Sequence, residues 1–462
     1  MSAVTRPDGE HRAHRVALFA DADLSRVVAW HDGHAVSAAE FLADVAEARG
    51  QLRPHGSVIN LCEDRYAFTV GFCAAVCHGQ TTLLPPSRAP QAIREVHALH
   101  PGAYVAGDAH SAHACDATIR LTRQAGGSGR RASADACVDA DLIAAIGFTS
   151  GSTGQPRPNA KSWGGFRSSS LLNIRVLSAA IGLGPGATAH VVATVPAQHM
   201  YGMELSVLLP LFGRFAVHSG RPFFPADIAR ALAEIPAPRL LVTTPVHLRA
   251  LLSDDLELPA IAAVVSATAP LTQSLAAEAE RRLHTRVLEL FGSTETCVIG
   301  YRRTALASDW CLHDGVSLQA QPDGTLVDTG YLPSPVLMQD ILEPLPDGCF
   351  RLHGRKGDLL EIAGKRASLA DLTRRLLALE GVVDAVVFQP DIDSGCRIQR
   401  LAALVVAPQR TEKELLNELR GAIDPLFLPR PLRLVDALPR NETGKLPRAA
   451  MLDALRKTPT EQ

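Results

Sequence analysis

Short runs of consecutive apolar residues recur through the first two-thirds of the chain, and helical patterns separate them. The runs are apolar throughout and do not alternate with polar positions, which is typical of strands that helices cover on both faces. This pattern predicts an α/β fold with mostly parallel sheets. The expected strands are Ser57–Leu61, Thr81–Leu84, Ala189–Val195, Arg214–His218, Arg239–Thr244, Ile261–Ser266 and Arg286–Phe291.

Helix signals lie between these runs. Ser37 followed by Glu40 forms a capping box at the start of a helix that continues to Leu52. A second helix is expected over Leu271–Leu283. Both segments fit the alternation of strands and helices that an α/β fold requires.

The pattern changes after about Arg355 and indicates a small, mobile α+β domain. Its expected strands are Val382–Gln389 and Arg400–Ala407, and its expected helices are Ser368–Leu379 and Glu412–Ile423. Since 462 residues are too many for one ordinary core, we predict two domains, over residues 1–355 and 356–462.

Composition narrows the class of protein. Hydrophobic residues make up 47% of the chain, charged residues make up 20%, and the net charge is −2. These values are typical of a soluble globular protein without a general attraction to nucleic acid or anionic membranes. The N-terminal segment has no apolar stretch behind its basic residues, and the apolar run Ala67–Cys77 is too short to cross a bilayer. We therefore expect neither a secretory signal nor a membrane span, and a cytoplasmic enzyme fits.

The nine cysteines show no pairing pattern. Cys73, Cys77 and His78 could be metal ligands, but no second Cys/His pair completes a site. Buried, reduced thiols are the favoured interpretation.

The segment Thr149–Arg157 gives the first indication of chemistry, and it follows the strand-like run Leu142–Phe148. Hydroxyl side chains, and backbone N–H groups that glycines leave accessible, can donate to phosphate oxygens. The spacing does not fit a Walker-type loop, and a hydroxyl-rich surface turn is the alternative. The candidate phosphate-binding residues are Thr149, Ser150, Gly151, Ser152, Thr153, Gly154 and Arg157.

A second motif follows the last expected strand of the first group, and it reads Phe291-Gly292-Ser293-Thr294-Glu295. With the phosphate loop, it resembles the acyl-adenylate-forming superfamily of acyl-CoA synthetases, aryl-acid ligases, peptide-synthetase adenylation domains and luciferases. The resemblance implies that Phe291 stacks on adenine, Thr294 offers its hydroxyl to the α-phosphate, and Glu295 holds Mg²⁺. Glu289 falls where the family often has a polar residue that reaches the adenine amino group.

Three later segments continue the resemblance in the family's order. Asp340, followed at the family's intervals by Gly348 and Gly354-Arg355, matches the residues that grip ribose. The stretch Gly354–Arg366 resembles the hinge of the mobile C-terminal domain, with Gly357 at the hinge position. Lys445, in the polar loop Pro439–Arg448, matches the catalytic lysine that bridges the carboxylate and the α-phosphate. The resemblance covers nearly the whole chain.

The chain departs from the family pattern at several of these positions. Arg157 stands where lysine is usual, so a guanidinium fork replaces a point charge, and Lys161 is a candidate to compensate. The usual Gly-Gly-Ala-Pro beside the adenine is here Ala267-Thr268-Ala269-Pro270. We expect these departures to affect the reaction rate and the fit of the nucleotide, and not the class of reaction.

A further motif resembles the family's acid pocket, with His199 guarding the entry. Amino-acid-activating relatives carry an aspartate near position 200, which is methionine here, so an amino acid is not expected. The apolar wall favours an aryl acid such as a hydroxybenzoate, as in the short aryl-acid ligases of bacterial pigment pathways, with a medium-chain fatty acid second. Simple core packing is the alternative for these side chains. The candidate pocket residues are His199, Met200, Tyr201, Gly202, Met203 and Ser266.

The resemblance implies an AMP-forming acid–thiol ligase that uses ATP and Mg²⁺. The acid becomes an acyl-adenylate, and a phosphopantetheine thiol of coenzyme A or of an acyl carrier protein then takes the acyl group. A non-catalytic homologue that binds nucleotide or acid as a regulatory module is the alternative from another class. Retention of Thr294, Glu295, Asp340, Arg355 and Lys445 argues against that alternative.

Overall fold

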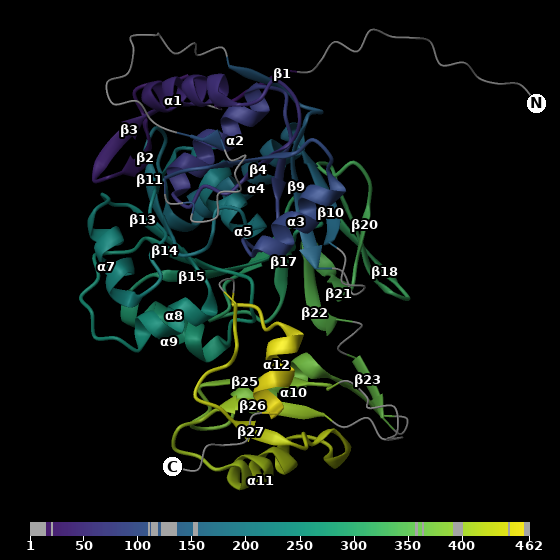
Figure 1. Cartoon of the computed structure of the whole chain (residues 1–462). Coiled ribbons are helices and arrows are strands. Elements are labelled where there is room, and N and C mark those ends of the chain that lie inside the picture. The colour runs from purple at the N-terminus through teal and green to yellow at the C-terminus, as the bar shows by residue number, and fades with distance from the viewer. Residues whose placement is uncertain are drawn as a thin grey trace, which may run out of the picture.

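The computed structural model describes most of the chain, and it separates into a large and a small domain (Figure 1). The large domain holds the N-terminal sheets and helices, and the small domain holds the C-terminal helices below it. The described residues are 15–19, 22–109, 111, 119–121, 136–150, 156–355, 359–362, 365–390, 401–441 and 444–456. The fold class expected from the sequence is confirmed, while the boundary at residues 355 and 356 stays a prediction.

A six-stranded sheet forms one layer of the large domain. Its neighbouring strands are parallel except for the antiparallel pair β9–β10, which forms a hairpin. Helices α2 (Arg65–Cys77) and α3 (Pro90–Leu99) follow its short buried strands. In spatial order the strands are β10 (Pro156–Ser162), β9 (Ile143–Ser150), β5 (Thr82–Leu84), β4 (Val58–Asn60), β6 (Tyr104–Gly107) and β7 (Ile119–Arg120).

An eleven-stranded sheet forms the second layer, and its strands from β2 to β15 are parallel. The apolar runs predicted the strands β11 to β15 of this part, and they did not predict β2. On one side of this part β3 pairs antiparallel with β2, and on the other side the strands formed by the chain after Glu295 also pair antiparallel. The large sheet is therefore less parallel than the sequence suggested. In spatial order the strands are β21 (Asp340–Leu345), β22 (Cys349–Arg355), β17 (Trp310–Leu312), β16 (Cys297–Arg302), β15 (Arg286–Ser293), β14 (Ala263–Ser266), β13 (Arg239–Thr243), β11 (Ala189–Ala193), β12 (Phe215–His218), β2 (Val27–His31) and β3 (His34–Ser37).

Helices cover both faces of the large sheet, which explains why its strands are apolar on both sides. Helix α1 (Ala38–Gln51) begins at the predicted capping box of Ser37 and Glu40. Helices α7 (Pro225–Ala233), α8 (Pro245–Leu252) and α9 (Gln273–Leu283) contribute the helix-side residues of one core cluster with β13, β14 and β15. Helices α2 and α4 (Trp163–Ile181) contribute to the other cluster, between the two sheets.

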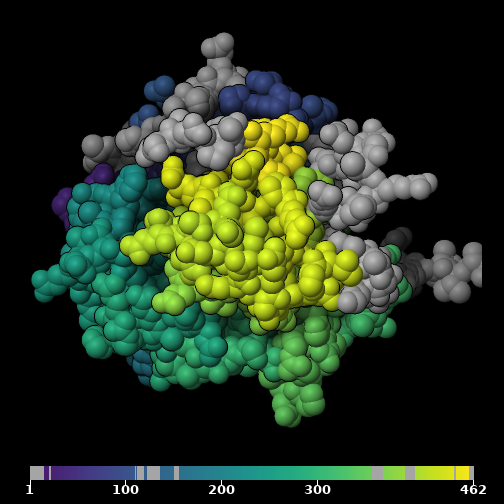
Figure 2. Space-filling view, turned by 90° about the horizontal axis from the view of Figure 1, so that it is seen from below, coloured from purple at the N-terminus to yellow at the C-terminus, as the bar shows by residue number. Residues whose placement is uncertain are grey.

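The small domain confirms the predicted α+β character. Strand β26 (Ala402–Val406) pairs antiparallel with β25 (Asp384–Phe388) and parallel with β27 (Leu432–Leu434). Helices α10 (Leu369–Leu377) and α11 (Glu412–Ala422) pack on this sheet in one core cluster, and α12 (Arg448–Arg456) packs in another. Seen from below, the domain lies over one end of the large domain (Figure 2).

The remaining described strands are short. Strand β1 (Arg15–Ala17) pairs with β8 (Cys137–Asp139), and β23 (Leu359–Ile362) pairs with β24 (Lys365–Ser368). Strands β18 (Val316–Gln321), β19 (Gly324–Thr329) and β20 (Val336–Met338) form a separate antiparallel sheet. Within the described ranges, no helix has the length and apolar character that a bilayer span needs.

Of the two cysteines of α2, Cys73 is buried, as expected for a core thiol, and Cys77 is half-buried. Cys73 is fully buried, and burial raises the pKa of its thiol well above the usual value. Among the described residues, no group of three or more histidine, cysteine or acidic side chains could hold a metal ion.

Candidate active site

The predicted site residues of the large domain gather at the carboxyl edge of the parallel strands. Strands β11, β13, β14 and β15 run in the same direction and end at this edge. Open α/β sheets bind ligands outside the carboxyl ends of their strands. The segments that follow β11, β14 and β15 are the candidate acid, adenine and metal motifs.

The predicted phosphate loop connects β9 to β10. Arg157 lies directly across from Thr149 in this hairpin, and its side chain is exposed. Residues Gly151, Ser152, Thr153 and Gly154 lie outside the described residues, as does the side chain of Ser150. Because opposite residues of an antiparallel pair share a face, Gly147, Thr149, Arg157, Asn159 and Lys161 all lie on one face of the hairpin.

The close neighbours of Gly147 show which residues lie against this face of the hairpin. A Cβ atom built on Gly147 would lie 2.8 Å from Thr294 Cγ2 and 3.2 Å from Met200 Cε. The first distance is shorter than real Cβ contacts and the second is tight, so a side chain at position 147 would displace Thr294 and press on Met200. The phosphate hairpin, the Thr294-Glu295 motif and the acid-pocket motif therefore converge on one point.

The turn between β15 and β16 presents Thr294 and Glu295. Gly292 permits the turn, since a Cβ there would lie 2.2 Å from the Cys297 carbonyl oxygen. Within the described part of the chain, the Glu295 carboxylate has no hydrogen bond or salt bridge, whereas its backbone carbonyl accepts a hydrogen bond from Lys161 Nζ. A single uncommitted carboxylate beside a phosphate site is the kind of ligand that Mg²⁺ uses with substrate phosphates, so Glu295 fits the predicted metal role.

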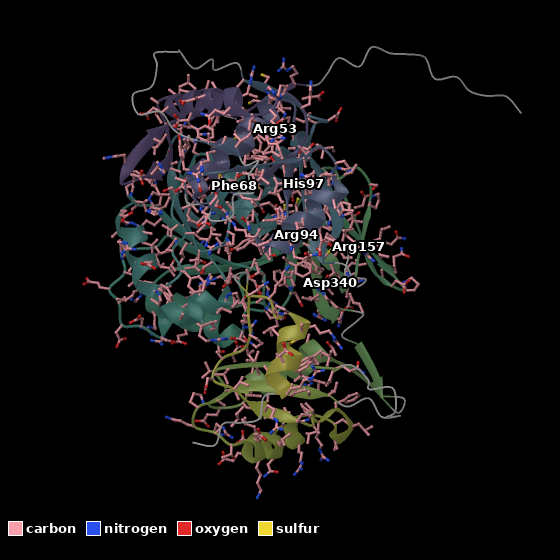
Figure 3. The ribbon with its side chains drawn as sticks, in the orientation of Figure 1. Arg53, Phe68, Arg94, His97, Arg157 and Asp340 are labelled. Atoms are coloured by element: carbon pink, nitrogen blue, oxygen red, sulfur yellow. The ribbon has the colours of Figure 1, made fainter. Side chains whose placement is uncertain are left out.

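The two residues of the candidate ribose pair lie side by side. Arg355 Nε donates to Asp340 Oδ1 at 3.2 Å, from the neighbouring strands β22 and β21. Asp340 is mostly buried, while the Arg355 side chain is 61% exposed. Figure 3 labels Asp340 and Arg157, and both lie at the end of the large domain that faces the small domain.

The candidate adenine slot contains the ring of Phe291 and the backbone of Thr268. The Phe291 ring is half-buried and contacts Trp310 and Phe350, with ring centroids 5.2 and 5.5 Å away. Thr268, in the segment where the family has glycine, adopts a φ of 77°. A β-branched residue is rare in this left-handed region, so the slot keeps the backbone shape that glycine would give despite the substitution.

Glu289 has a different environment from the one its predicted role requires. Its carboxylate is buried and accepts from the Leu271 N–H at 3.1 Å, from Arg302 Nε at 2.8 Å and from the Thr304 hydroxyl at 2.6 Å. Burial raises the pKa of this carboxyl, and the Arg302 charge opposes the shift. Both carboxylate oxygens accept hydrogen bonds from other protein groups, so in this structure Glu289 holds in place the segment that begins with Leu271.

Lys445 lies in a tight turn of the small domain. The Gly444 N–H donates to the Asn441 carbonyl at 2.8 Å, and the Lys445 N–H donates to Asn441 Oδ1 at 2.9 Å. Arg440 donates to the Gly444 carbonyl at 2.8 Å and pairs with Asp384 at 2.8 Å. The side chain is thus carried by a turn whose backbone is fixed on several sides.

This turn contacts the large domain. A Cβ on Gly444 would lie 3.7 Å from Val246 Cγ2 and 3.9 Å from Thr268 Oγ1, which places the turn against the candidate adenine segment. Arg249 of α8 also approaches Asp384 of β25 at 3.9 Å across the two domains. The small domain is therefore closed over the site with Lys445 directed at it.

The charges around Lys445 identify its neighbours. Although its side chain is solvent-exposed, surrounding protein lowers the pKa of Lys445, the Arg355 charge lowers it further, and Glu295 opposes the shift. Burial together with the Lys445 charge lowers the pKa of His199 to about 3. Lys445, Glu295, Arg355 and His199 therefore share one electrostatic environment, and His199 is neutral at pH 7.

The candidate acid pocket is built on a helix that starts at His199. Gly202 is required there, since a Cβ would lie 2.0 Å from the Pro196 carbonyl oxygen. The helix begins as α5 (Met200–Gly202), continues as the π-helix η1 (Met203–Leu208) and ends as α6 (Leu209–Phe212). Single π-helical turns inside α-helices are frequent at functional sites.

The predicted pocket residues do not all face the same space. Met200 meets Gly147, but Met203 is fully buried in the core, and the Tyr201 hydroxyl is committed to the Val265 carbonyl at 2.9 Å. Along β14, Val264 packs on the α8–α9 side and Val265 on the other, so alternation turns Ser266 to the α8–α9 side. The structure thus groups His199 and Met200 with the catalytic residues and leaves Ser266 on the opposite face of the strand.

Sequence reasoning did not find three polar residues around this site. Buried Arg65 donates to the carbonyls that flank the acid motif, Ala193 and Val195, at 2.9 and 2.8 Å. Asn159 donates to the Gly147 carbonyl at 3.3 Å, and Glu204 lies buried behind the metal turn. For Asn159, the every-second-residue spacing with Arg157 and Lys161 is a signal that the sequence contains.

Comparison with known proteins decides the family. Residues 9–321 match the family described as AMP-binding enzyme, and residues 374–445 match the AMP-binding enzyme C-terminal domain. The first match covers more than half of the chain, and the two together include both domains described above.

The chain belongs to the AMP-binding enzyme family.

Its curated relatives include ligases of coenzyme A. It is 29% identical over 313 residues to a 4-coumarate–CoA ligase of Halorhodospira halophila, covering 64% of this chain and 73% of the relative. It is 30% identical over 310 residues to the 4-coumarate–CoA ligase of Cereibacter sphaeroides, covering 64% of this chain and 69% of that one.

Solved structures share the fold of this AMP-binding enzyme. ATP-bound MatB from Rhodopseudomonas palustris matches with a TM-score of 0.73 and 20% identity, covering 94% of this chain and 96% of that one. The O-succinylbenzoate coenzyme A synthetase of Bacillus subtilis, in complex with ATP and magnesium ion, matches with a TM-score of 0.74 and 18% identity, covering 92% and 96%. A benzoate CoA ligase from Burkholderia xenovorans matches with a TM-score of 0.74 and 18% identity, covering 93% and 96%.

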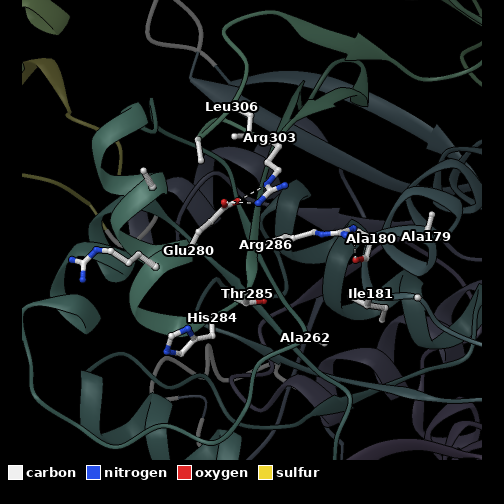
Figure 4. A pocket seen from close by; sticks show the side chains of 14 residues that line it. Ala179, Ala180, Ile181, Ala262, Glu280, His284, Thr285, Arg286, Arg303 and Leu306 are labelled. Atoms are coloured by element: carbon white, nitrogen blue, oxygen red, sulfur yellow. Dashed lines mark hydrogen bonds and ion pairs between the residues drawn. The ribbon is translucent and has the colours of Figure 1, made fainter.

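One hollow of the described surface lies away from the site. It has a volume of about 890 Å³, and the C-terminal turns of α4 and α9 and the start of β15 line it (Figure 4). Arg303 and Glu280 form an ion pair of 2.7 Å across it. This position is the amino edge of the sheet, opposite to the edge where the predicted residues gather, so the hollow is not the active site.

Substitution of Arg157 tests the charge at the end of the phosphate hairpin. We expect Arg157→Ala to lower acid-dependent ATP–pyrophosphate exchange by about tenfold, and Arg157→Lys to retain most of it, because the charge on this exposed face matters more than its shape. The measurement is the exchange rate as a function of ATP concentration. Unchanged rates in both variants would exclude the charge from the mechanism.

The buried histidines predict a loss of stability in acid. Burial lowers the pKa of His190, His247 and His313 to about 4 and that of His199 to about 3. Below about pH 6.5 these histidines bind protons in the unfolded chain but not in the folded chain. The free energy of unfolding therefore decreases as the pH falls, by up to about 3 kcal/mol for each histidine. Glu204 has the opposite effect, because burial raises its pKa to about 7 and the folded chain therefore holds its proton more tightly. This single carboxyl does not outweigh the four histidines.

Urea unfolding between pH 7.5 and pH 4.5 measures this dependence. Trp30 Nε1 donates to His190 Nδ1 at 2.9 Å, so that nitrogen must stay unprotonated in the folded protein. His190→Gln should therefore make the free energy of unfolding less dependent on pH, by the equivalent of about one proton bound on unfolding. A slope that is flat in the parent protein would contradict the assignment of neutral histidines.

Proposed function

We propose that this enzyme activates an aryl carboxylic acid with ATP and transfers the acyl group to a phosphopantetheine thiol. The observation that carries the proposal is the grouping of Lys445 with Glu295, Arg355 and His199 at the mouth of the acid motif. Family membership and the curated CoA ligases support the ligase chemistry. The aryl acid and the identity of the acceptor are our inference.

In the first half-reaction an oxygen of the acid attacks the α-phosphorus of ATP, the bond to the β-phosphate oxygen breaks, and pyrophosphate leaves. The main barrier is the approach of two anions, so the chain must supply positive charge and alignment. Lys445 neutralises the carboxylate and the α-phosphate, and Thr294 donates its hydroxyl to the same phosphate. Mg²⁺ bound at Glu295 would neutralise the remaining phosphate charge.

In the second half-reaction the thiolate sulfur attacks the acyl carbon, and AMP leaves with the electrons of the broken carbon–oxygen bond. The thiol proton passes to solvent. This step needs no cation at the α-phosphate, because AMP is already a competent leaving group. Lys445 is therefore required for the first step alone.

The aryl preference rests on the wall of the acid motif. Met200 supplies a polarizable thioether, and His199 is a neutral ring at the entry, so this end of the pocket is apolar and without net charge. The position that would hold an amino acid's ammonium is Met200 itself. An uncharged aromatic acid suits this lining better than an amino acid does.

A pyrophosphate-exchange screen over aryl, fatty and amino acids tests the proposal. We expect exchange with benzoate- or hydroxybenzoate-like acids and none with amino acids. Exchange with medium-chain fatty acids alone would replace the aryl assignment, and release of inorganic phosphate or no turnover with any acid would refute the ligase itself. Offering coenzyme A and a phosphopantetheinylated carrier protein in parallel then identifies the acceptor.

A further inference from the structure

Two charged side chains lie behind the turn that carries Thr294 and Glu295, and the mechanism above does not use either. Lys161 on β10 is 5% exposed, and Glu204 on the π-helix η1 is 1% exposed. Burying a charge is costly unless it is paired and hydrogen-bonded. Both residues therefore need hydrogen-bond partners that offset the free-energy cost of removing them from water.

Their partners are backbone groups on either side of Glu295. Lys161 Nζ donates to the Glu295 carbonyl oxygen. The Val298 N–H donates to the Glu204 carboxylate, 3.2 Å from each oxygen. The two side chains thus hold the turn at the residue that presents the carboxylate and at the strand that leaves it.

Other residues fix Glu204 in turn. Asn173 Nδ2 donates to Glu204 Oε2 at 3.2 Å, and His313 Nε2 lies 3.1 Å from the Asn173 amide oxygen. Burial raises the pKa of Glu204 to about 7, and the positive charge of Lys161 opposes that shift, so Lys161 favours the ionised form of Glu204. The pair forms one buried electrostatic unit that spans two elements, β10 and η1.

The turn needs support from outside itself. Cys297 adopts a φ of 61°, a left-handed conformation that costs energy for a residue with a side chain. The internal contacts include hydrogen bonds of 3.1 and 3.2 Å between Ser293 and Thr296, and one of 2.9 Å from the Thr296 hydroxyl to the Cys297 carbonyl. Charged partners on the Glu295 carbonyl and the Val298 N–H supply stronger restraints than these.

We propose that Lys161 and Glu204 are positioning residues that hold the Thr294-Glu295 turn in the geometry needed to receive the metal–triphosphate. The inference rests on the proposed function, since it assigns these residues to the first half-reaction. Neither residue touches a reacting atom. Both act through the backbone of the turn.

The test compares Lys161→Met, Glu204→Gln and the double variant with a matched control, Glu280→Gln. Glu280 of α9 accepts from the Val287 N–H at 3.0 Å, near the start of the strand β15 that leads to the turn, and pairs with Arg303. It therefore repeats the contact type of Glu204 away from the site. The double variant removes both buried charges at once, so it should recover stability that either single variant loses.

Two readouts are needed. The first is hydrogen exchange of residues 291–301 in the ligand-free enzyme, which we expect to become about tenfold faster in the single and double variants and to stay unchanged in Glu280→Gln. The second is pyrophosphate exchange against the concentration of Mg²⁺ and ATP. We expect a loss of about 10- to 100-fold in the three site variants, while thiol capture of supplied acyl-adenylate is retained.

The outcomes separate a positioning role from a structural one. If the double variant regains activity along with stability, or if Glu280→Gln loses as much exchange activity as Glu204→Gln, the positioning role is wrong. If the three site variants match the parent protein in both readouts, it is wrong as well. Absence of exchange in the parent protein with every acid would instead refute the proposed function, so the two failures are distinguishable.

Discussion

Lys445→Ala should abolish acid-dependent ATP–pyrophosphate exchange, with a loss of about a thousandfold, because it removes the cation that offsets two approaching anions. Thiol capture of supplied acyl-adenylate should survive, since the second half-reaction does not need that cation. The Lys445 charge contributes to the lowered pKa of His199, and the charges of Arg355 and Glu295 act on the pKa of Lys445, so this lysine lies among the residues that we assign to the first half-reaction. The measurement is the rate of each half-reaction in separate assays.

The control for this substitution is Lys413→Ala, an exposed lysine of α11 in the same domain. It should leave both half-reactions unchanged. Lys445→Arg keeps the charge on a longer, forked side chain and should recover only part of the exchange activity. Equal loss of both half-reactions in Lys445→Ala would contradict the role assigned to Lys445.

Glu295→Gln should lower pyrophosphate exchange by about a hundredfold to a thousandfold and should raise the Mg²⁺ concentration needed for half-maximal rate. Glutamine matches the size of glutamate, and the backbone carbonyl that accepts from Lys161 remains in place. The substitution therefore removes the charge of the metal ligand while it preserves the turn. Exchange measured over a range of Mg²⁺ at fixed ATP gives both effects.

Two further measurements restrict this interpretation. AMP binding by calorimetry without Mg²⁺ should be unchanged in Glu295→Gln, since the nucleotide slot does not contain its carboxylate. Glu278→Gln, an exposed glutamate of α9, should behave as the parent protein throughout. An unaltered Mg²⁺ dependence in Glu295→Gln would remove this carboxylate from the metal site.

Much of the fold could be predicted because its signals are local. The capping box of Ser37 and Glu40 starts α1 where expected, and the apolar runs from Ala189–Val195 to Arg286–Phe291 coincide with β11 to β15, of which β15 continues two residues further. A capping box works within one turn of helix, and a strand buried on both faces must be apolar throughout. Such features are complete within a few residues, so the sequence shows them directly.

The environment of individual site residues was less predictable. Glu289 lies in the expected strand, yet Arg302 and Thr304 occupy its carboxylate. Ser266 ends the expected strand, yet alternation turns it away from Met200. Lys161 was considered as a replacement for the charge of Arg157, but it is buried and donates to the Glu295 carbonyl. In each case strand register or a distant partner decides the outcome, and neither is a property of the local segment.

The sequence by itself determined the elements and the chemical groups of this AMP-binding enzyme, because hydrophobic period, capping residues and motif spacing act over short stretches of chain. Only the tertiary structure decided which of those groups meet. The contact of Gly147 with Thr294 and Met200, and the closure of Lys445 over Glu295, join segments that are far apart in the chain. Such encounters depend on how two sheets and two domains pack, and that packing is the sum of many long-range contacts that no single stretch of sequence specifies.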